Sequence, residues 1–280
     1  MTTMENVAMD DGVLQGRTAI VTGGGRGLGR AMVLGLAKAG VQVIATAARE
    51  VAEVEGVAKE AEKVRGTGLV IPLQADVTRE ADCAEVVETA KRRFGRLDIL
   101  VNNAGRGMKY VSEKFLSEPT RFWEVEPETW RMVIDSNVNG PFLMARLAAP
   151  AMVKAGWGRI INVSMNHETM RRRGFSPYGP SKAALESETV IWAQDLEGTG
   201  VTVNALFPGG ATLTGMIPDE VPEQIRASLL DPAIMVPPLL WLASPASDGI
   251  TGRRFTATKW KQGEDRRAAA EAAMDPAGWA

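Results

Sequence analysis

Short apolar runs alternate with longer segments of helical period along most of this 280-residue chain. Each run has the length of a buried strand, and the segment after it carries apolar residues at helical spacing. Parallel strands need a crossover connection, and an α-helix usually provides it. The alternation therefore predicts an α/β fold of the doubly wound Rossmann type, with helices on both faces of a mainly parallel sheet of about seven strands. We expect these strands at residues 17–22, 41–47, 69–76, 97–104, 159–164, 201–208 and 253–258.

A single domain is expected for residues 1–280, with its core at about 16–258, because this length fits one large α/β core. Two long loops, 106–126 and 212–236, break the rhythm. Loops that leave the carboxyl ends of parallel strands usually wall a ligand pocket. The charged, alanine-rich tail, 259–280, is either a helix against a neighbouring subunit or disordered.

Charge and patterning argue against several classes of partner. The chain has 32 Lys and Arg against 34 Asp and Glu, so its net charge of −2 gives no reason to expect nucleic acid or an anionic membrane. No apolar run approaches the ~20 residues that span a bilayer, and the acidic start lacks the pattern of a secretion signal. The lone Cys83 fits a buried apolar position in a reducing compartment. We expect a cytoplasmic protein whose partner is a small molecule.

A glycine-rich loop, GGGRGLGR, follows the first predicted strand and precedes a helical segment. Gly23, Gly27 and Gly29 allow a sharp turn and a close approach to a pyrophosphate, which the helix N-terminus would hold. The general G-x-G-x-x-G spacing is not met, and a structural tight turn is the alternative. The order of strand, loop and helix favours a dinucleotide site.

The end of the second strand bears on the choice of cofactor. An acidic residue there would bind the adenine ribose hydroxyls, but this chain has Ala47, and the next acidic residue is Glu50. Without a carboxylate nothing repels a 2′-phosphate, and Arg26 and Arg49 supply positive charge. NADP is therefore favoured, with NAD as the alternative. In the competing interpretation, Arg49 is a solvated residue at the start of a helix.

Three motifs together resemble the classical short-chain dehydrogenase/reductase family: TGGGRGLG at 22–29, NNAG at 102–105 and YGPSK at 178–182. The resemblance covers roughly residues 16–252, and the family's T-G-x-x-x-G-x-G loop is met in full. It implies an NAD(P)-dependent oxidoreductase for a carbonyl or secondary alcohol, assembled as a homodimer or homotetramer through helices near 130–154 and 178–197. With the charge argument above, the expected cofactor contacts are Thr22, Gly23, Arg26, Gly27, Leu28, Gly29, Arg49, Asp76, Val77, Asn103, Ala104, Gly105, Tyr178, Lys182, Pro208, Gly209 and Ala211.

Tyr178 and Lys182 are four residues apart, so in a helix they lie on one face. A nearby ammonium and an oxidised nicotinamide both favour the phenolate, which lets Tyr178 exchange a proton with a substrate oxygen. The resemblance assigns Lys182 to the nicotinamide ribose and Asn137 to a water in a proton relay. Without the other motifs, a Tyr and a Lys at this spacing would be an ordinary surface pair.

The sequence offers two alternatives for the residue that supplies the catalytic hydroxyl. The family usually places a Ser thirteen residues before the Tyr, where this chain has Met165, and Ser164 is fourteen before. Met cannot donate a hydrogen bond to an oxyanion. Either the loop 166–177 holds one extra residue and Ser164 is catalytic, or Asn166 or His167 substitutes. We favour Ser164 because loops absorb single insertions readily.

No metal site is expected, because His167 is the only histidine and no cysteine lies near it in the sequence. A second class of function stays open: a catalytically silent dinucleotide-binding protein that acts as a sensor or scaffold. An intact Asn137, Tyr178 and Lys182 argue against it, whereas an empty hydroxyl position would favour it.

Overall fold

One mainly parallel sheet organises the computed structural model, which describes residues 12–65, 70–218 and 221–278. The strand order is β3-β2-β1-β4-β5-β6-β7-β8, and neighbours from β3 to β7 are parallel. All seven predicted strands are present, and the unpredicted β8 pairs antiparallel with β7. The strands are β1 (Thr18–Val21), β2 (Gln42–Ala47), β3 (Val70–Gln74), β4 (Ile99–Asn102), β5 (Gly158–Val163), β6 (Val201–Phe207), β7 (Arg253–Thr256) and β8 (Met274–Pro276).

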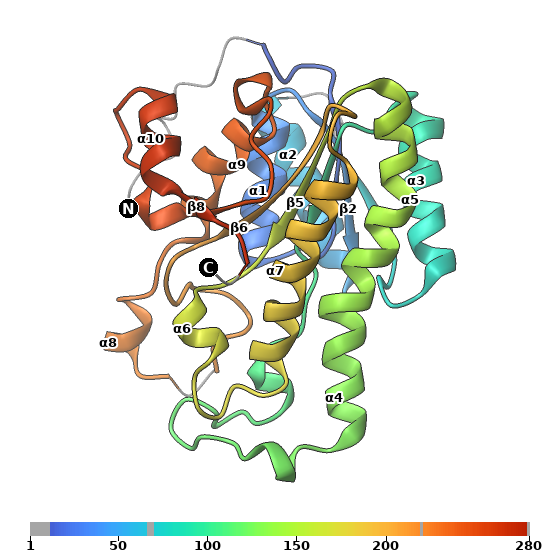
Figure 1. Cartoon of the computed structure of the whole chain (residues 1–280). Helices are drawn as coiled ribbons and strands as arrows, with labels where there is room; N and C mark the ends of the chain where they lie inside the picture. The colour runs from blue at the N-terminus through green and yellow to red at the C-terminus, as the bar shows by residue number, and fades with distance from the viewer. Residues whose placement is uncertain (1–11, 66–69, 219–220, 279–280) are drawn as a thin grey trace.

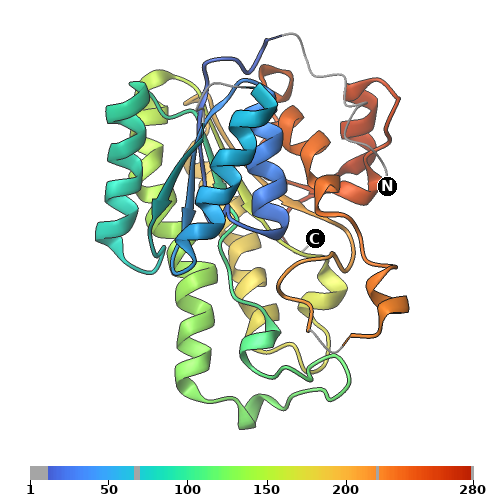
Figure 2. The same ribbon diagram turned by 180° about the vertical axis from the view of Figure 1, so that it is seen from behind.

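Helices cover both faces of the sheet, as predicted (Figures 1 and 2). One face carries α1 (Gly27–Lys38), α2 (Val51–Arg65), α9 (Val236–Leu242) and α10 (Arg266–Ala273). The other carries α3 (Glu80–Phe94), α5 (Gly140–Ala155) and α7 (Tyr178–Asp195). Because both faces are covered, the central strands β1, β4, β5 and β6 are buried along their whole length, which explains their continuous apolar runs.

A π-helical segment, η4 (Asp135–Asn139), joins α4 (Pro127–Ile134) to α5 without a break. A π-turn holds one more residue than an α-turn and is found mostly at functional sites. Here it places Asn137 with no exposed surface. The predicted long loops contain short helical turns: η2 (Met108–Tyr110) and η3 (Phe122–Glu124) in 106–126, and α8 (Glu223–Arg226) and η5 (Pro232–Met235) in 212–236.

The tail belongs to the same sheet. Asp265 caps α10 by accepting hydrogen bonds from the Arg267 and Ala268 amides at 2.9 and 3.2 Å. Ala270 and Ala273 then pack into the core beside α9, and Ala269 is also buried, all three at no more than 1% exposure. The expected helix is present, but it packs on its own chain, and the disordered alternative does not hold for the described part of the tail. No helix among the described residues is long and apolar enough to cross a membrane.

Candidate active site

The predicted site residues gather at the carboxyl edge of the sheet. Thr22 follows β1, Gly105 lies beyond β4, Ser164 follows β5 and Pro208 follows β6. Parallel strands bring their carboxyl ends to one edge, and ligands of open α/β sheets bind there. The fold therefore converts residues far apart in the sequence into neighbours.

The glycine loop tolerates no side chains where the sequence predicts close approach. Gly23 and Gly27 have φ of +65° and +52°, in the left-handed region. A Cβ at Gly29 would lie 2.0 Å from the Gly23 carbonyl oxygen. Leu28 lies in the first turn of α1, whose N-terminus begins at Gly27. This cradle of bare backbone at a helix N-terminus fits a pyrophosphate.

Hydrogen bonds fix the glycine loop to the end of β4. Asn103 Nδ2 donates to the carbonyl oxygens of Thr22 and Gly23 at 2.8 and 2.9 Å. Thr22 Oγ1 accepts from the backbone amides of Asn103 and Ala104, both at 3.0 Å. The TGGG and NNAG motifs therefore form one unit, in which each motif positions the other.

The predicted phosphate-binding arginines lie in different settings. Arg49 is exposed at the end of β2. Arg26 forms an ion pair with Glu53 of α2, with 3.5 Å between Nη1 and Oε1, and the two side chains are 61% and 35% exposed. The sequence analysis missed Glu53, because a carboxylate in the first turn of a helix gives no sign that it folds back on the glycine loop.

Asp76 and Val77 follow β3, where the resemblance implies adenine contacts. Asp76 Oδ1 accepts hydrogen bonds from the Thr78 amide and hydroxyl at 2.9 and 2.8 Å. Burial opposes ionisation of Asp76, but these hydrogen bonds, with Arg106 and Arg49, leave its pKa below the usual value. Asp76 is therefore an ionised group that stiffens this turn.

Asn137 ties the loop after β4 to the start of α7. Its Oδ1 accepts from the Arg106 amide at 2.8 Å, and its Nδ2 donates to the Arg106 carbonyl and to Ser181 Oγ, both at 2.9 Å. Ser181 Oγ in turn donates to the Tyr178 carbonyl at 2.7 Å. The water-holding role implied by the resemblance stays a prediction, because these bonds show Asn137 only as a link between the loop after β4 and the first turn of α7.

Tyr178 and Lys182 occupy the first turns of α7, as the spacing predicts. Lys182 Nζ donates to the Val163 carbonyl at the end of β5, at 2.8 Å. A Cβ at Gly105 would lie 3.0 Å from Asn137 Oδ1 and 3.8 Å from Lys182 Nζ, so these three residues converge. The motif pair is part of the site and not an ordinary surface pair.

Burial sets the proton affinities of the pair. It raises the pKa of Tyr178 to about 12. It lowers the pKa of Lys182 to about 8, against the opposing pull of the Glu186 carboxylate. The expected lowering of the Tyr178 pKa by Lys182 is therefore not a property of the protein alone. At neutral pH Tyr178 is a phenol and can donate a proton.

Ser164 is buried, and its Oγ has no hydrogen-bond partner among the described residues. Buried hydroxyls usually have a partner, so an orphaned one next to Val163, which binds Lys182, is unusual. The Met165 carbonyl accepts a hydrogen bond from Arg254 at 2.8 Å, and Asn166 Oδ1 caps α6 (His167–Met170) by accepting from the Thr169 amide at 2.8 Å. Asn166 is therefore engaged elsewhere, which leaves Ser164 as the better candidate for the catalytic hydroxyl.

The loop after β6 closes over the site. A Cβ at Gly27 would lie 3.0 Å from Thr214 Cγ2, and a Cβ at Gly107 would lie 3.1 Å from Met216 Sδ. The Tyr178 hydroxyl points at the same sulfur, at 3.9 Å. A substrate oxygen that meets this hydroxyl has to replace the Met216 sulfur. The sequence marked 212–236 as a pocket wall but could not single out Met216.

The predicted cofactor-binding residues at the start of this loop differ in their surroundings. Gly209 has φ of +96°, and a Cβ there would lie 2.1 Å from Thr258 Oγ1. The Pro208 carbonyl accepts a hydrogen bond from the Thr258 amide at 3.1 Å, whereas Ala211 is exposed. In the described part of the chain, no cluster of three or more His, Cys, Asp or Glu could hold a metal ion.

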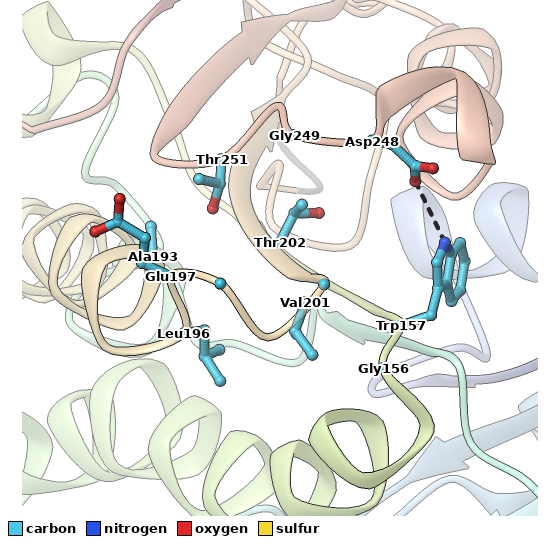
Figure 3. Close-up of a pocket in the computed structure, with 12 residues that line it drawn as sticks. Gly156, Trp157, Ala193, Leu196, Glu197, Val201, Thr202, Asp248, Gly249 and Thr251 are labelled. Atoms are coloured by element: carbon cyan, nitrogen blue, oxygen red, sulfur yellow. Dashed lines mark hydrogen bonds between the residues drawn. The ribbon is translucent and has the colours of Figure 1, made fainter.

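A crevice of about 420 Å³ lies at the opposite end of the sheet (Figure 3). It is bounded by Trp157 before β5, Val201 at the start of β6 and Asp248, which accepts a hydrogen bond from Trp157 Nε1 at 3.3 Å. It faces the amino ends of β5 and β6 and is therefore remote from the chemistry-bearing residues.

Comparisons with known proteins agree with this geometry. Residues 17–224 match the family model described as short chain dehydrogenase. A short-chain type dehydrogenase/reductase of Picea abies is 37% identical over 200 residues, which cover 70% of this chain and 71% of the relative. The 3-oxoacyl-(acyl-carrier-protein) reductase of Thermotoga maritima is 31% identical over 250 residues, which cover 86% and 95%. The crystal structure of a 3-ketoacyl-(acyl-carrier-protein) reductase from Brucella melitensis complexed with NADH superposes with a TM-score of 0.73 at 31% identity, over 85% of this chain and 95% of that chain. The chain therefore belongs to the short-chain dehydrogenase family, as the three motifs predicted.

Proposed function

We propose that this chain is an NAD(P)-dependent oxidoreductase that interconverts a carbonyl and a secondary alcohol, with Tyr178 as the proton donor and acceptor. The observation that carries the proposal is the placement of Tyr178 and Lys182 on the first turns of α7, with Lys182 near Gly105 and Asn137. The known reductases similar to this chain, one of them bound to NADH, support the reaction class.

The chain's own residues would share the chemistry as follows. The bare glycine loop would hold the pyrophosphate, and Lys182 would bind the nicotinamide ribose. When bound, the cofactor supplies or accepts the hydride. In reduction, Tyr178 donates its hydroxyl proton to the substrate oxygen, for which its raised pKa keeps it protonated. In oxidation, the phenolate of Tyr178, which the positive charge of an oxidised nicotinamide would favour, accepts the hydroxyl proton, and Ser164 Oγ donates a hydrogen bond to the same substrate oxygen.

The decisive experiment is Tyr178→Phe. This change should lower turnover by about 10²–10⁴-fold because the proton donor is lost, while cofactor binding stays intact. Cofactor oxidation over a panel of ketones measures the first effect, and cofactor fluorescence titration measures the second. Undiminished turnover would refute the assigned proton donor.

The second candidate, a silent dinucleotide-binding sensor or scaffold, is favoured only by the Met at the usual serine position. It requires cofactor binding with no turnover on any ketone or alcohol in the same panel. Turnover by the wild-type protein with one substrate would exclude it.

We propose NADP(H) as the preferred cofactor, with NAD(H) as the alternative. Support comes from the exposed Arg49 and from Arg26. The ion pair of Arg26 with Glu53 is exposed and therefore worth only about 0.2–1 kcal/mol, so a 2′-phosphate can compete for the guanidinium.

We also infer a homodimer or homotetramer, which the family resemblance implies, and a cytoplasmic location, which the lone Cys83 favours. Apolar side chains on the outer faces of three helices support association: Trp130, Phe142, Val153 and Ile191 are 41%, 46%, 40% and 51% exposed. Light scattering after size exclusion gives the oligomeric state, and a monomer at micromolar concentration would contradict the inference.

A further inference from the structure

A buried ion pair lies behind the candidate active site. Glu186 of α7 has no exposed surface, and its Oε1 lies 3.6 Å from Nη2 of Arg254, whose side chain is 8% exposed. The Arg254 guanidinium also stacks over the Phe207 ring, with Cζ 4.4 Å from the centroid. Burying two charges costs free energy that their attraction often fails to recover, so an ion pair like this one is weak evidence for a stabilising role. Its contacts indicate another role.

Arg254 holds the backbone that follows the candidate hydroxyl. The nitrogen that faces Glu186, Nη2, also donates to the Met165 carbonyl at 2.8 Å. Met165 is adjacent to Ser164, whose Oγ is buried without a partner in the described residues. The Ser164 amide donates to the Leu206 carbonyl at 3.0 Å, and the Arg254 contact is a second hydrogen bond that holds this turn.

Glu186 acts electrostatically on Lys182, another residue of the candidate site. It lies four residues after Lys182 on α7, hence one turn away on the same face. Its carboxylate raises the pKa of Lys182 against the lowering by burial. The backbone amide of Gly278, in the turn after β8, donates to Glu186 Oε2 at 3.4 Å. The carboxylate is therefore held from two sides.

Several charged groups face this pair from neighbouring elements. Arg254 comes from β7, Asp275 from β8 and His167 from α6, and Lys182 lies on α7 itself. Burial lowers the pKa of His167, and Arg254 adds to this, while Glu186 and Asp275 oppose it. His167 is therefore mainly neutral near neutral pH, and the charge that acts on Lys182 from this side is that of Glu186.

We propose that Glu186 and Arg254 are positioning residues of the active site: Arg254 fixes the turn that carries Ser164, and Glu186 orients Arg254 and keeps Lys182 in its ammonium form. The inference rests on the proposed function, in which Ser164 and Lys182 take part in the reaction. It goes beyond that function because both residues would act through Met165 and Lys182 and not on the substrate itself.

The effect of Glu186 on the protonation of Lys182 can be tested without measuring turnover. In protein labelled with ¹³C at lysine Cε, Lys182 is identified by the signal that Lys182→Arg removes, and its titration is followed by NMR. The wild-type apparent pKa should be about 8. Glu186→Gln should lower it by about one unit, because a nearby negative charge is removed from a weakly polar site. An unchanged titration would overturn this effect of Glu186, whatever the reaction proves to be.

The role of Arg254 in fixing the turn that carries Ser164 is tested by kinetics at matched pH. Arg254→Met should lower kcat by about 10- to 100-fold through misplacement of Ser164, with KM for the cofactor unchanged. Arg254→Lys should recover part of the loss because a donor and a charge return. Arg253→Met is the matched control: this neighbouring arginine of β7 is exposed, and its loss should leave kcat unchanged.

The double variant Glu186→Gln/Arg254→Met distinguishes a role in stability alone from a role in positioning the active site. Each single change leaves a buried group unpaired and should lower Tm, whereas the double change removes both charges and should restore much of Tm. Under the proposal, kcat stays low in the double variant. The pH below which the rate of alcohol oxidation falls is also higher in this variant than in the wild-type protein. Recovery of kcat together with Tm would overturn the proposal. Turnover retained by Tyr178→Phe would instead refute the proposed function.

Discussion

Ser164 and Met165 divide two tasks at the end of β5. Ser164 offers a buried hydroxyl without a partner in the described residues, and Met165 offers a backbone carbonyl that Arg254 binds. The methionine that occupies the family's usual serine position therefore serves through its backbone. Under the proposed function, a side chain that cannot donate a hydrogen bond is tolerated there because the adjacent Ser164 supplies the donor.

Ser164→Ala should lower kcat by about 10²–10³-fold, because one donor to the developing oxyanion is lost. Met165→Ala keeps the carbonyl and should leave kcat close to the wild-type value. Steady-state kinetics with one ketone measures both variants. The reverse pattern, with Met165→Ala impaired and Ser164→Ala active, would contradict the assignment.

Glu53 places a carboxylate beside the glycine loop, although β2 itself ends without one. A Cβ at Gly25 would lie 3.2 Å from Glu53 Oε2, and the same carboxylate pairs with Arg26. Glu53→Gln should therefore lower KM for NADP(H) by about two- to fivefold, the range for an exposed charge, and leave KM for NAD(H) unchanged.

Glu55→Gln is the matched control for this change, since it removes an exposed carboxylate from the same helix. If both variants shift KM equally, the effect is one of overall charge. If Glu53→Gln shifts neither cofactor, Arg26 takes no part in cofactor preference.

At the scale of the element, α7 contains two glutamates with buried carboxyl groups. Besides Glu186 it holds Glu188, whose Oε2 is buried and finds no hydrogen-bond partner in the part of the chain the structure describes. Burial raises the pKa of Glu188 to about 7. A carboxyl whose pKa is raised on folding holds its proton more tightly in the native state. The contribution of Glu188 to the free energy of unfolding is therefore fully present below pH 4.5 and is lost as pH rises through 7.

Glu188→Gln should remove this dependence, because the amide does not ionise. Chemical denaturation at pH 8 should show the variant more stable than wild type by about 1–3 kcal/mol, and the two should converge near pH 4.5. A variant that gains nothing at pH 8 would show that Glu188 finds a partner, for example across a subunit interface formed by α7.

At the scale of the whole molecule, the tail completes the sheet. Residues beyond 260 cover Trp241 and Phe255 with α10 and protect the edge of β7 with β8. The strand β8 has three residues and ends in Pro276, which lacks an amide hydrogen, so it is a poor template for further pairing.

Ending the chain after Trp260 should lower stability by about 2–4 kcal/mol, since the buried alanine methyls of α10 and part of the apolar surface beneath them return to water. It should also promote association through the uncovered β7. Thermal unfolding and light scattering measure the two effects. Lys261→Ala, which breaks only an exposed ion pair with Glu264 at 3.3 Å, is the control and should change little.

Local pattern was sufficient to predict the seven parallel strands and the glycine loop, because each depends on a few consecutive residues. The strand β8 escaped prediction because MDP has no apolar alternation, and only its pairing with β7 makes it a strand. The same limit applies to the site. Tyr178, Lys182 and Asn137 were recognisable from motifs, whereas Met216, Glu53 and the Glu186–Arg254 pair depend on contacts between distant segments.

The π-helical segment η4 sets the rotation of α4 relative to α5 within one continuous helix. An α-helix turns about 100° per residue, so the extra residue stored in Asp135–Asn139 rotates the contact face of α4 relative to α5 by roughly that angle. Deleting one residue here would return the segment to regular α-helix and rotate everything before it, including Trp130, around the axis. Insertions and deletions in this stretch would therefore act as rotations of one helix against the rest of the protein, and Asn137 lies at the pivot.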